Sequence, residues 1–255
     1  MIIDTHAHLM FDKFEGEVDQ VVERAKEVGV GKIINIGCTL KDAIRSHEMS
    51  LKYDELYATL GLHPHDALDI SDELMVKWAG LIEENKRIVA IGECGLDYVK
   101  ADVPKEDQKK AFRMQLKLAQ KVGLPVIIHN RDADEDTMEI LDEFDVNAVF
   151  HCYSSDIEFA RKLWYKGYFT SFTGVVTYPN TEDLLKVVEE APMDKFMVET
   201  DCPFLAPQGH RGERNEPSYV AEVVEKIAEI KRSSPEEIAR ISTENAEGLF
   251  FRLNR

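Results

Sequence analysis

The sequence lacks several features that mark common classes of protein. It has only four cysteines in 255 residues and no Cys-x-x-Cys pair, which indicates a protein of a reducing compartment. Lysine and arginine number 31 against 48 aspartates and glutamates, so the formal net charge is −17. This balance excludes a broad basic surface for nucleic acid. A small phosphate site built on metal ions stays compatible with it, because the ions bring their own positive charge.

Signals for export or membrane insertion are also missing. No apolar run approaches the roughly 18 residues that a membrane span requires, and the N-terminus has no basic segment followed by a long apolar one. We therefore expect a cytoplasmic protein without a membrane partner, and no feature indicates an obligate protein partner. With 44% hydrophobic residues the chain can bury a full core. Barrels of this length are routinely single domains, so we predict one domain over residues 1–255.

Short apolar runs alternate with amphipathic segments along the whole chain. The runs are rich in Ile, Val and Phe without strict polar alternation, as expected for strands buried on both faces. Segments with helical spacing of apolar residues include 18–28, 111–122 and 220–230. The eight strand candidates are Met1–His8, Lys32–Thr39, Leu56–His63, Ile88–Leu96, Pro125–Asn130, Ala148–Tyr153, Tyr168–Val176 and Lys195–Asp201.

Eight strand–helix alternations in about 250 residues predict an α/β protein with the (β/α)8, or TIM-barrel, fold. A doubly wound open sheet is the alternative, but its dinucleotide-binding form needs Gly-x-Gly-x-x-Gly after an early strand, and none is present. The longest irregular stretch, Pro203–Pro217, follows the last strand. We expect it to be a surface loop over the functional site.

The first strand carries a chemical signal at its end. His6 and His8 are separated by one residue, and side chains at i and i+2 of a strand point to the same side. Two imidazoles facing one point are suited to hold a metal ion. By itself the pattern also arises by chance at a wet strand end.

Other histidines and carboxylates stand at the ends of further strands. In a barrel the carboxyl ends of all strands converge on the face that carries the active site. Four imidazoles and two carboxylates gathered there could hold two divalent ions, with one carboxylate bridging, which is a common device for hydrolysing phosphate esters. These six residues are His6, His8, Glu93, His129, His151 and Asp201.

A cysteine follows directly on three of these side chains. A zinc–thiolate site is one interpretation, but successive residues of a strand point to opposite faces. We therefore expect Cys94, Cys152 and Cys202 to pack as small hydrophobic side chains.

Six longer motifs stand at or near the ends of the predicted strands. They are Ile3-Asp4-Thr5-His6-Ala7-His8, Gly61-Leu62-His63-Pro64-His65, Ile91-Gly92-Glu93-Cys94-Gly95-Leu96-Asp97-Tyr98, Pro125-Val126-Ile127-Ile128-His129-Asn130-Arg131, Val149-Phe150-His151-Cys152 and Glu199-Thr200-Asp201-Cys202-Pro203. These motifs resemble those of the TatD family of metal-dependent deoxyribonucleases, within the wider amidohydrolase-like barrels. They run from the first strand to the last, so the resemblance covers essentially the whole chain.

The resemblance implies two divalent metal ions per chain, of a kind such as Mg, Mn or Zn. One ion would be surrounded by His6, His8, Glu93 and Asp201, and the second by Glu93, His129 and His151, so that Glu93 bridges. Related barrels of the phosphotriesterase and dihydroorotase kind have a carboxylated lysine at the end of strand four. This chain has glutamate there, which separates the TatD interpretation from those relatives better than His-x-His does.

The function that we expect is metal-dependent deoxyribonuclease activity, exonuclease-like, in which a metal-activated water attacks a DNA phosphodiester. Asp201 is the candidate to orient the water and accept its proton; a pure ligand role is the alternative. Arg131 could grip a phosphate in bidentate fashion, or form a surface salt bridge. We expect His63 and His65 to contact substrate rather than metal.

The expected partner is DNA, engaged over a few nucleotides at a strand end with little reading of sequence. Arg211 and Arg214, with Arg131, could add a small basic patch.

Two alternatives from other classes stay open. The first is a metal-dependent hydrolase of a small-molecule ester, lactone, amide or phosphotriester, which would share the barrel and the metals and differ only in pocket shape. The second is a non-enzymatic metal-binding protein on a barrel scaffold. Such a protein would not need a complete ligand set with an open position for water.

Overall fold

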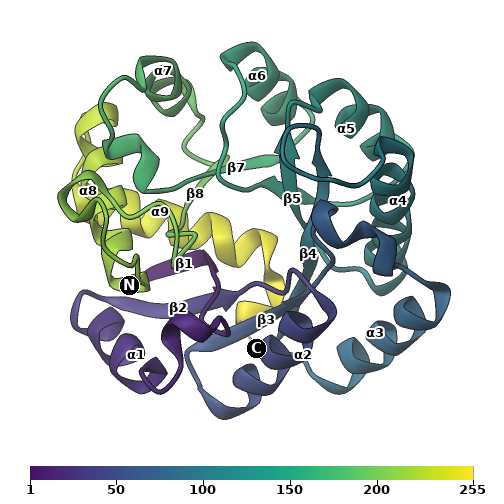
Figure 1. Ribbon diagram of the computed structural model, residues 1–255. Coiled ribbons are helices and arrows are strands. Elements are labelled where there is room, and N and C mark those ends of the chain that lie inside the picture. The colour runs from purple at the N-terminus through teal and green to yellow at the C-terminus, as the bar shows by residue number, and fades with distance from the viewer. Residues whose placement is uncertain (255) are drawn as a thin grey trace. The chain divides into compact units, whose positions relative to one another are not determined.

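The computed structural model describes residues 1–254, and strands and helices alternate along the chain (Figure 1). The strands are β1 (Ile2–Ala7), β2 (Val30–Asn35), β3 (Leu56–Leu60), β4 (Ile88–Asp97), β5 (Val126–Arg131), β6 (Ala148–Phe150), β7 (Phe169–Phe172) and β8 (Phe196–Val198). The α-helices are α1 (Val18–Glu27), α2 (Leu40–Lys52), α3 (Asp72–Glu84), α4 (Lys105–Val122), α5 (Asp134–Leu141), α6 (Ile157–Tyr165), α7 (Glu182–Glu190), α8 (Val220–Lys231) and α9 (Pro235–Leu249).

The strands form one eight-stranded sheet in the order β1-β2-β3-β4-β5-β6-β7-β8. Sequential order with a helix after nearly every strand is the topology of the (β/α)8 barrel, which confirms the predicted fold. The chain divides into two compact units. Unit 1 contains residues 1–35 and 152–248, and unit 2 contains residues 36–151 and 249–255. The prediction of one domain over the chain stays a prediction.

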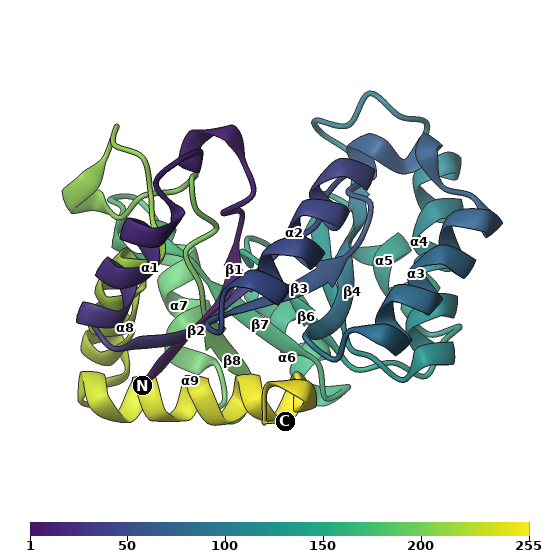
Figure 2. The same ribbon diagram turned by 90° about the horizontal axis from the view of Figure 1, so that it is seen from below.

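Unit 1 is built on two pairs of parallel strands, β1 with β2 and β7 with β8. The amphipathic helix α1 buries Val21, Val22 and Ala25, three residues of the apolar stripe that predicted it. Lys32 of β2 forms an ion pair of 2.8 Å with Glu247, which ties α9 to this strand. The long helix α9, yellow in Figure 2, begins at Pro235.

Unit 2 is built on four parallel strands, β3 to β6. Helix α4 buries a wide apolar stripe that includes Phe112 and Leu116, and full burial of such a side chain contributes about 1.5–3 kcal/mol. The same helix also fixes two strand ends through buried amides. Gln115 accepts a hydrogen bond from the N–H of Leu62 (2.8 Å) and donates one to its carbonyl (3.1 Å). Gln108 makes the same pair of bonds to Asp97, at 2.9 and 3.1 Å.

The eight predicted strands are all present, but six of them end earlier than predicted: the segment 1–8 ends one residue early, at Ala7, and five others end three or four residues early. The segments 32–39, 56–63, 148–153, 168–176 and 195–201 end as strands at Asn35, Leu60, Phe150, Phe172 and Val198. One cause is visible after β6, where Cys152 has φ of 44°. A residue in the left-handed region turns the chain out of the ladder. Several candidate site residues therefore lie just past the strands, where alternation of faces does not apply.

The loop Pro203–Pro217 contains one short 3-10 helix, Gln208–His210, and a second begins at Pro217. Asn215 stabilises this loop by donating hydrogen bonds to the carbonyls of Thr200 (2.8 Å) and Phe204 (2.6 Å). Among residues 1–254, no helix is both long and apolar enough to span a membrane.

Candidate metal centre

Unit 1 brings three of the predicted ligands together, and we call His6, His8 and Asp201 the first donor group. The Nε2 atoms of His6 and His8 lie 3.3 Å apart. Oδ1 of Asp201 lies 3.3 Å from Nε2 of His8 and 3.7 Å from Nε2 of His6. His6 is fully buried, and the Asp201 side chain keeps 14% of its surface exposed. The three donor atoms thus face one another, as the His-x-His spacing predicts for its two imidazoles.

Backbone pairing holds the first donor group in place. The N–H of Asp201 donates to the carbonyl of His6, and the N–H of His8 donates to the carbonyl of Cys202, each at 2.8 Å. The three ligand residues themselves take part in these bonds, and the chain after β8 runs alongside the end of β1. The register of the two backbones therefore helps to decide where the donor atoms meet.

Asp4 adds a buried link between the same two segments. Its carboxylate accepts hydrogen bonds from the N–H of Thr200 (2.9 Å), from the Thr200 hydroxyl (2.6 Å) and from the N–H of His6 (3.3 Å). Complete burial raises the pKa of Asp4 to about 7, although these hydrogen bonds act in the opposite direction. The link positions His6 relative to the residue before Asp201.

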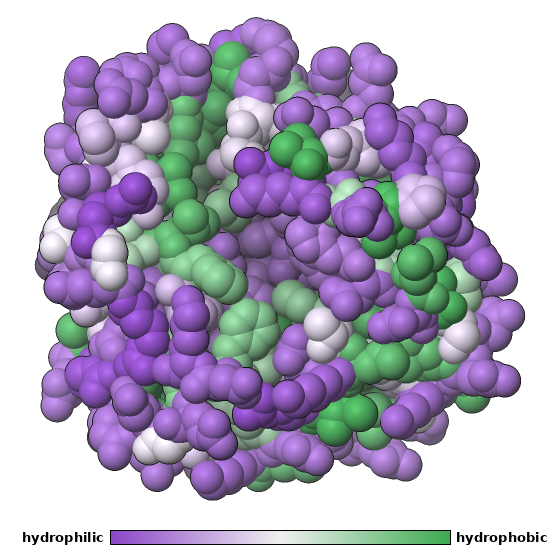
Figure 3. Space-filling view, in the orientation of Figure 1, coloured by the Kyte–Doolittle hydropathy of each residue, from purple (hydrophilic) through white to green (hydrophobic). Residues whose placement is uncertain are grey.

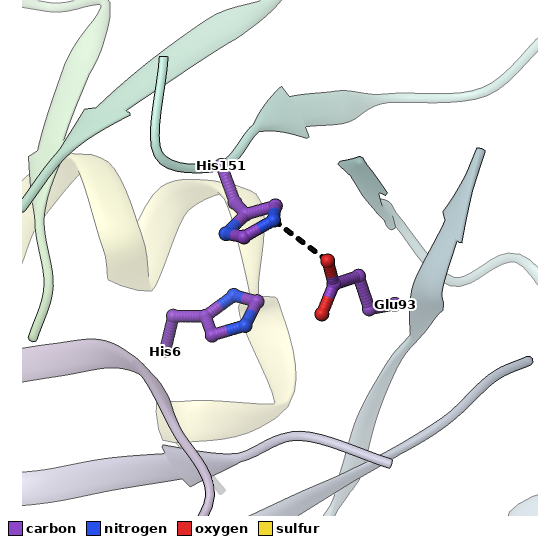
Figure 4. Close-up of side chains that lie close together, drawn as sticks. All are labelled: His6, Glu93 and His151. Carbon is purple, nitrogen blue, oxygen red and sulfur yellow. Dashed lines mark ion pairs between the residues drawn. The ribbon is translucent and has the colours of Figure 1, made fainter. Parts of the chain in front are cut away.

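Unit 2 brings together three further predicted ligands, and we call Glu93, His129 and His151 the second donor group. Oε1 of Glu93 lies 2.7 Å from Nε2 of His151 and 2.9 Å from Nδ1 of His129. Figure 4 shows the Glu93–His151 pair as a dashed line; His6, also drawn there, belongs to the first donor group. The two imidazole nitrogens lie 3.4 Å apart. The donors come from β4, from β5 and from the residue after β6.

A glycine allows β4 and β5 to approach closely enough for this geometry. Gly95 has φ of 142°, and a Cβ atom there would lie 2.0 Å from the carbonyl oxygen of His129. Only glycine fits this position without moving β5. The small residue two places after Glu93 therefore determines how near His129 can come.

Both groups have the donor chemistry of a divalent metal site. Imidazole nitrogens and carboxylate oxygens about 2.0–2.2 Å from a tetrahedral ion are about 3.4 Å from one another. The separations in the first donor group, 3.3 to 3.7 Å, match this spacing. In the second donor group the two nitrogens match it at 3.4 Å, whereas the contacts to Glu93 have hydrogen-bond lengths. The residues present therefore fit a metal ion in each unit, with the second group opening by about half an ångström.

Asp97 is a site residue that the sequence reasoning missed. Its Oδ2 lies 3.2 Å from Nε2 of His129, the ring nitrogen that faces away from Glu93. Its Oδ1 accepts hydrogen bonds from the N–H groups of Val99 (2.9 Å) and Lys100 (2.7 Å). A carboxylate on the outer nitrogen fixes the tautomer of a metal-binding histidine. A signal was present, because Glu93 and Asp97 are four residues apart on one strand and so share a face.

Two carboxylates surround the imidazole of His129 and act on its pKa. Burial disfavours its charge, but the hydrogen bonds with Asp97 and Glu93 outweigh burial and raise the pKa of His129. The pKa of Asp97 is held well below its usual range: burial opposes ionisation, but His129 and the two backbone N–H groups more than compensate.

His63 and His65, predicted to contact substrate, lie beside the second donor group. Nε2 of His63 is 3.7 Å from Oε1 of Glu93, so His63 could also serve as a donor there. Burial lowers the pKa of His63 to about 3 despite the nearby Glu93, so its ring is neutral at pH 7. Nε2 of His65 lies 3.6 Å from Oδ2 of Asp97, and its side chain is 43% exposed. Their substrate role stays a prediction.

The three candidate phosphate-binding arginines differ in their surroundings. Arg131 is exposed at the end of β5, and its side chain forms no ion pair within residues 1–254. Arg214 is bonded to Glu17 at 2.8 Å, so its charge is already balanced. Arg211 lies 4.1 Å over the ring of Tyr178. Of the three, Arg131 is thus the one without a carboxylate partner or an aromatic ring beneath it.

Two further polar residues support the strand ends. Glu199, 1% exposed, accepts hydrogen bonds from the N–H of Cys152 (2.7 Å) and the hydroxyl of Ser171 (2.6 Å). It therefore holds the turn that directly follows His151. Sγ of Cys38 lies 3.4 Å from Oε2 of Glu93. Cys94 and Cys202 are buried as predicted, while Cys152 is half-buried.

The fold and the two donor groups define a metal-dependent hydrolase built on a TIM barrel. The chain belongs to the TatD family: the family model described as TatD related DNase matches residues 3–251. The chain is 46% identical to the uncharacterized metal-dependent hydrolase YabD of Bacillus subtilis over 100% of both chains. It is 34% identical to the uncharacterized metal-dependent hydrolase YcfH of Escherichia coli, over 98% of this chain and 95% of that protein.

A solved structure agrees with these relatives. The crystal structure of YjjV, a TatD homologue from Escherichia coli, superposes with a TM-score of 0.92 at 32% identity and covers 98% of both chains. The resemblance that the strand-end motifs indicated is thereby confirmed, and so is the fold over nearly the whole chain.

Proposed function

We propose that the chain is a deoxyribonuclease that hydrolyses DNA phosphodiester bonds, in an exonuclease-like manner, at a centre of two metal ions. The observation that carries the proposal is the second donor group, where the β4 carboxylate of Glu93 meets two imidazoles at 2.7 and 2.9 Å. A glutamate at this position is the feature that set the sequence apart from the small-molecule hydrolases of the barrel class. The family description as a DNase supports the same substrate.

We assign one divalent ion to each donor group, of a kind such as Mg, Mn or Zn. Bound divalent ions lower the pKa of water and neutralise charge on phosphoryl oxygens. The six ligands would be His6, His8 and Asp201 in unit 1, and Glu93, His129 and His151 in unit 2. The bridging role of Glu93 that the resemblance implies stays a prediction.

The remaining roles follow from the positions of the side chains. Asp201 keeps part of its carboxylate exposed, so it can orient a water molecule and accept its proton. Arg131, which has no ion pair within the described residues, can hold a phosphate through two N–H donors. His63 is neutral and close to Glu93, and it can bond to substrate oxygens. The expected engagement covers a few nucleotides without sequence reading, and the location is expected to be cytoplasmic.

A substrate panel tests this proposal. Purified protein is stripped of metal, reloaded with Mg²⁺ or Mn²⁺, and assayed on single- and double-stranded DNA, RNA, lactones, amides and phosphotriesters. We expect hydrolysis of DNA, and a loss on the order of a thousandfold in Glu93→Ala and in His151→Ala, because each removes a metal ligand.

The matched control is Glu83→Ala, which removes an exposed glutamate near the end of α3 and should leave the rate unchanged. Hydrolysis of small esters or lactones without hydrolysis of DNA would contradict the deoxyribonuclease and favour the small-molecule alternative. Undiminished activity in Glu93→Ala and His151→Ala would rule out the metal centre itself.

A further inference from the structure

Two phenylalanines, Phe11 and Phe204, lie against His8 of the first donor group. The ring of Phe11 stacks on the imidazole of His8, with centroids 4.8 Å apart and planes 12° apart. Phe204 meets both rings edge-on, 6.1 Å from Phe11 and 6.2 Å from His8. Phe11 follows His8 by three residues, and Phe204 follows Asp201 by three. Each segment that supplies a donor thus also supplies an aromatic ring.

The two rings differ in how much of their surface is exposed to solvent, which indicates different roles. Phe11 is half-buried, and its parallel contact with His8 is enough to explain its presence. Phe204 keeps 46% of its surface exposed, so it contributes little to the core. An exposed hydrophobic side chain on its own needs no explanation. An exposed ring that touches both a metal-donor histidine and a second aromatic ring is a different case, because it offers a flat apolar surface next to the donors.

The surroundings of Phe204 carry positive charge. Nζ of Lys13 lies 5.4 Å from the centroid of the Phe204 ring. Lys13 is exposed, and within residues 1–254 its ammonium group has no carboxylate partner. The chain has a net charge of −17, so acidic side chains outnumber basic ones. A lysine that has no carboxylate partner and lies beside an exposed aromatic ring therefore stands out as a place that could attract an anion. Figure 3 shows hydrophobic side chains, in green, reaching the surface among hydrophilic ones on the face seen in Figure 1.

We propose that Phe204, backed by Phe11, is a stacking platform for one nucleobase of the DNA strand, and that Lys13 contacts an adjoining phosphate. This inference rests on the proposed deoxyribonuclease function and adds a base-binding subsite to it. An aromatic ring stacks on every base, which gives affinity without sequence reading. A lysine acts on phosphate as a point charge. The ring lies 6.2 Å from His8, so a nucleotide stacked on it has its backbone at the first donor group.

Steady-state hydrolysis of two matched single-stranded oligonucleotides tests the platform. One oligonucleotide carries ordinary bases, and the other has tetrahydrofuran abasic sugars on the same phosphodiester backbone. Phe204→Ala should raise KM for the first about tenfold with kcat nearly unchanged, in line with the loss of one base stack. It should leave the abasic oligonucleotide unaffected, and Phe204→Tyr should behave as the wild type.

A binding measurement supplies a readout that does not depend on turnover. A single-stranded trinucleotide containing 2-aminopurine is titrated with each variant in the presence of Ca²⁺, and its fluorescence falls when the base stacks. The wild type and Phe204→Tyr should quench the probe, and Phe204→Ala should not. Tyr165→Ala, which removes a side chain that is 93% exposed on α6, is the control and should quench it fully.

The outcomes separate this inference from the function on which it rests. Equal loss on both oligonucleotides in Phe204→Ala would mean that the ring shields His8, and would overturn the platform. Unchanged hydrolysis and quenching in Phe204→Ala would overturn it as well, while the deoxyribonuclease would stand. Hydrolysis of small esters by a wild type that neither cleaves nor quenches any oligonucleotide would overturn both.

Discussion

The two donor groups have the same chemistry and are held in partly different ways. In the first, His6 lies near the end of β1 and His8 directly after it, and the third ligand comes from a segment whose backbone pairs with this stretch through bonds of 2.8 Å. In the second, the ligands come from three strand ends and are connected by side-chain contacts of 2.7 to 3.4 Å. Both groups therefore rest on paired backbones, since the N–H of His151 also bonds to the carbonyl of Ile128. The second group adds a carboxylate at hydrogen-bond distance from both of its imidazoles.

This difference has consequences for metal binding. The first donor group already has the donor spacing of a tetrahedral ion, so binding there needs little rearrangement. In the second, His129 is shared between the carboxylates of Glu93 and Asp97, which raise its pKa, so a proton competes with a metal ion for this imidazole. Metal affinity of the second group should therefore depend on pH and on Asp97, a residue outside the ligand set.

The largest effect is expected when one ligand is removed from each donor group, which tests whether each group binds its own metal ion. His8→Ala and His129→Ala should each lower the bound Mn²⁺ from two ions per chain to one, measured by elemental analysis after equilibrium dialysis. Each should also lower DNA hydrolysis on the order of a thousandfold, because the proposed reaction uses both ions. His210→Ala is the control, since His210 pairs with Glu213 and Glu222 in the loop. Loss of both ions from either variant would show that the groups do not fill independently.

A smaller effect should follow from altering the carboxylate behind His129. Asp97→Asn keeps an oxygen for the N–H groups of Val99 and Lys100 but removes the acceptor for Nε2 of His129. Loss of such an outer partner costs about 10- to 100-fold in metal affinity. Calorimetric titration with Mn²⁺ should show this weakening at one of the two sites only. The control is Asp102→Asn, at an exposed position, which should leave the metal affinity of both sites unchanged. Equal weakening of both sites in Asp97→Asn would contradict the inference that Asp97 acts on the second donor group alone.

The smallest effect concerns the loop that adjoins the first donor group. Burial disfavours the charge of Glu216, but the guanidinium of Arg24 (2.6 Å) and the hydroxyl of Ser218 (2.6 Å) overcome it and lower the pKa of Glu216. A carboxylate with a lowered pKa in the folded state contributes stability above its unfolded pKa near 4.5, and this contribution is lost as pH falls. Glu216→Gln should therefore lower the free energy of unfolding by about 2 kcal/mol at pH 7, and by progressively less below pH 4.5.

Urea unfolding of the metal-free protein at pH 7 and at pH 4 measures this dependence. Glu143→Gln in unit 2 is the control, because its partner Arg113 is at the surface and both side chains are more than a third exposed. Such a pair contributes about 0.5 kcal/mol or less. A Glu216→Gln variant whose deficit is the same at both pH values would refute the role of the carboxylate charge.

The sequence was most informative where a local pattern determines geometry. His6 and His8 converge because the two-residue period of a strand is a local property, and the order of eight apolar runs was enough to predict the barrel. The ends of the strands were harder to predict from the sequence. Cys152 leaves the ladder in the left-handed region, and whether a residue does so depends on partners such as Glu199, which is 47 residues from Cys152 in the chain.

The sequence alone thus determined the fold class, the family and the six candidate ligands, because these follow from periodicity and from motifs at strand ends. Only the tertiary structure decided how the ligands are grouped within each unit, that Asp97 lies behind His129, and that Phe204 is exposed beside His8. These features depend on which backbones pair and which side chains meet across them. Such contacts join residues far apart in the chain, and no local spacing encodes them.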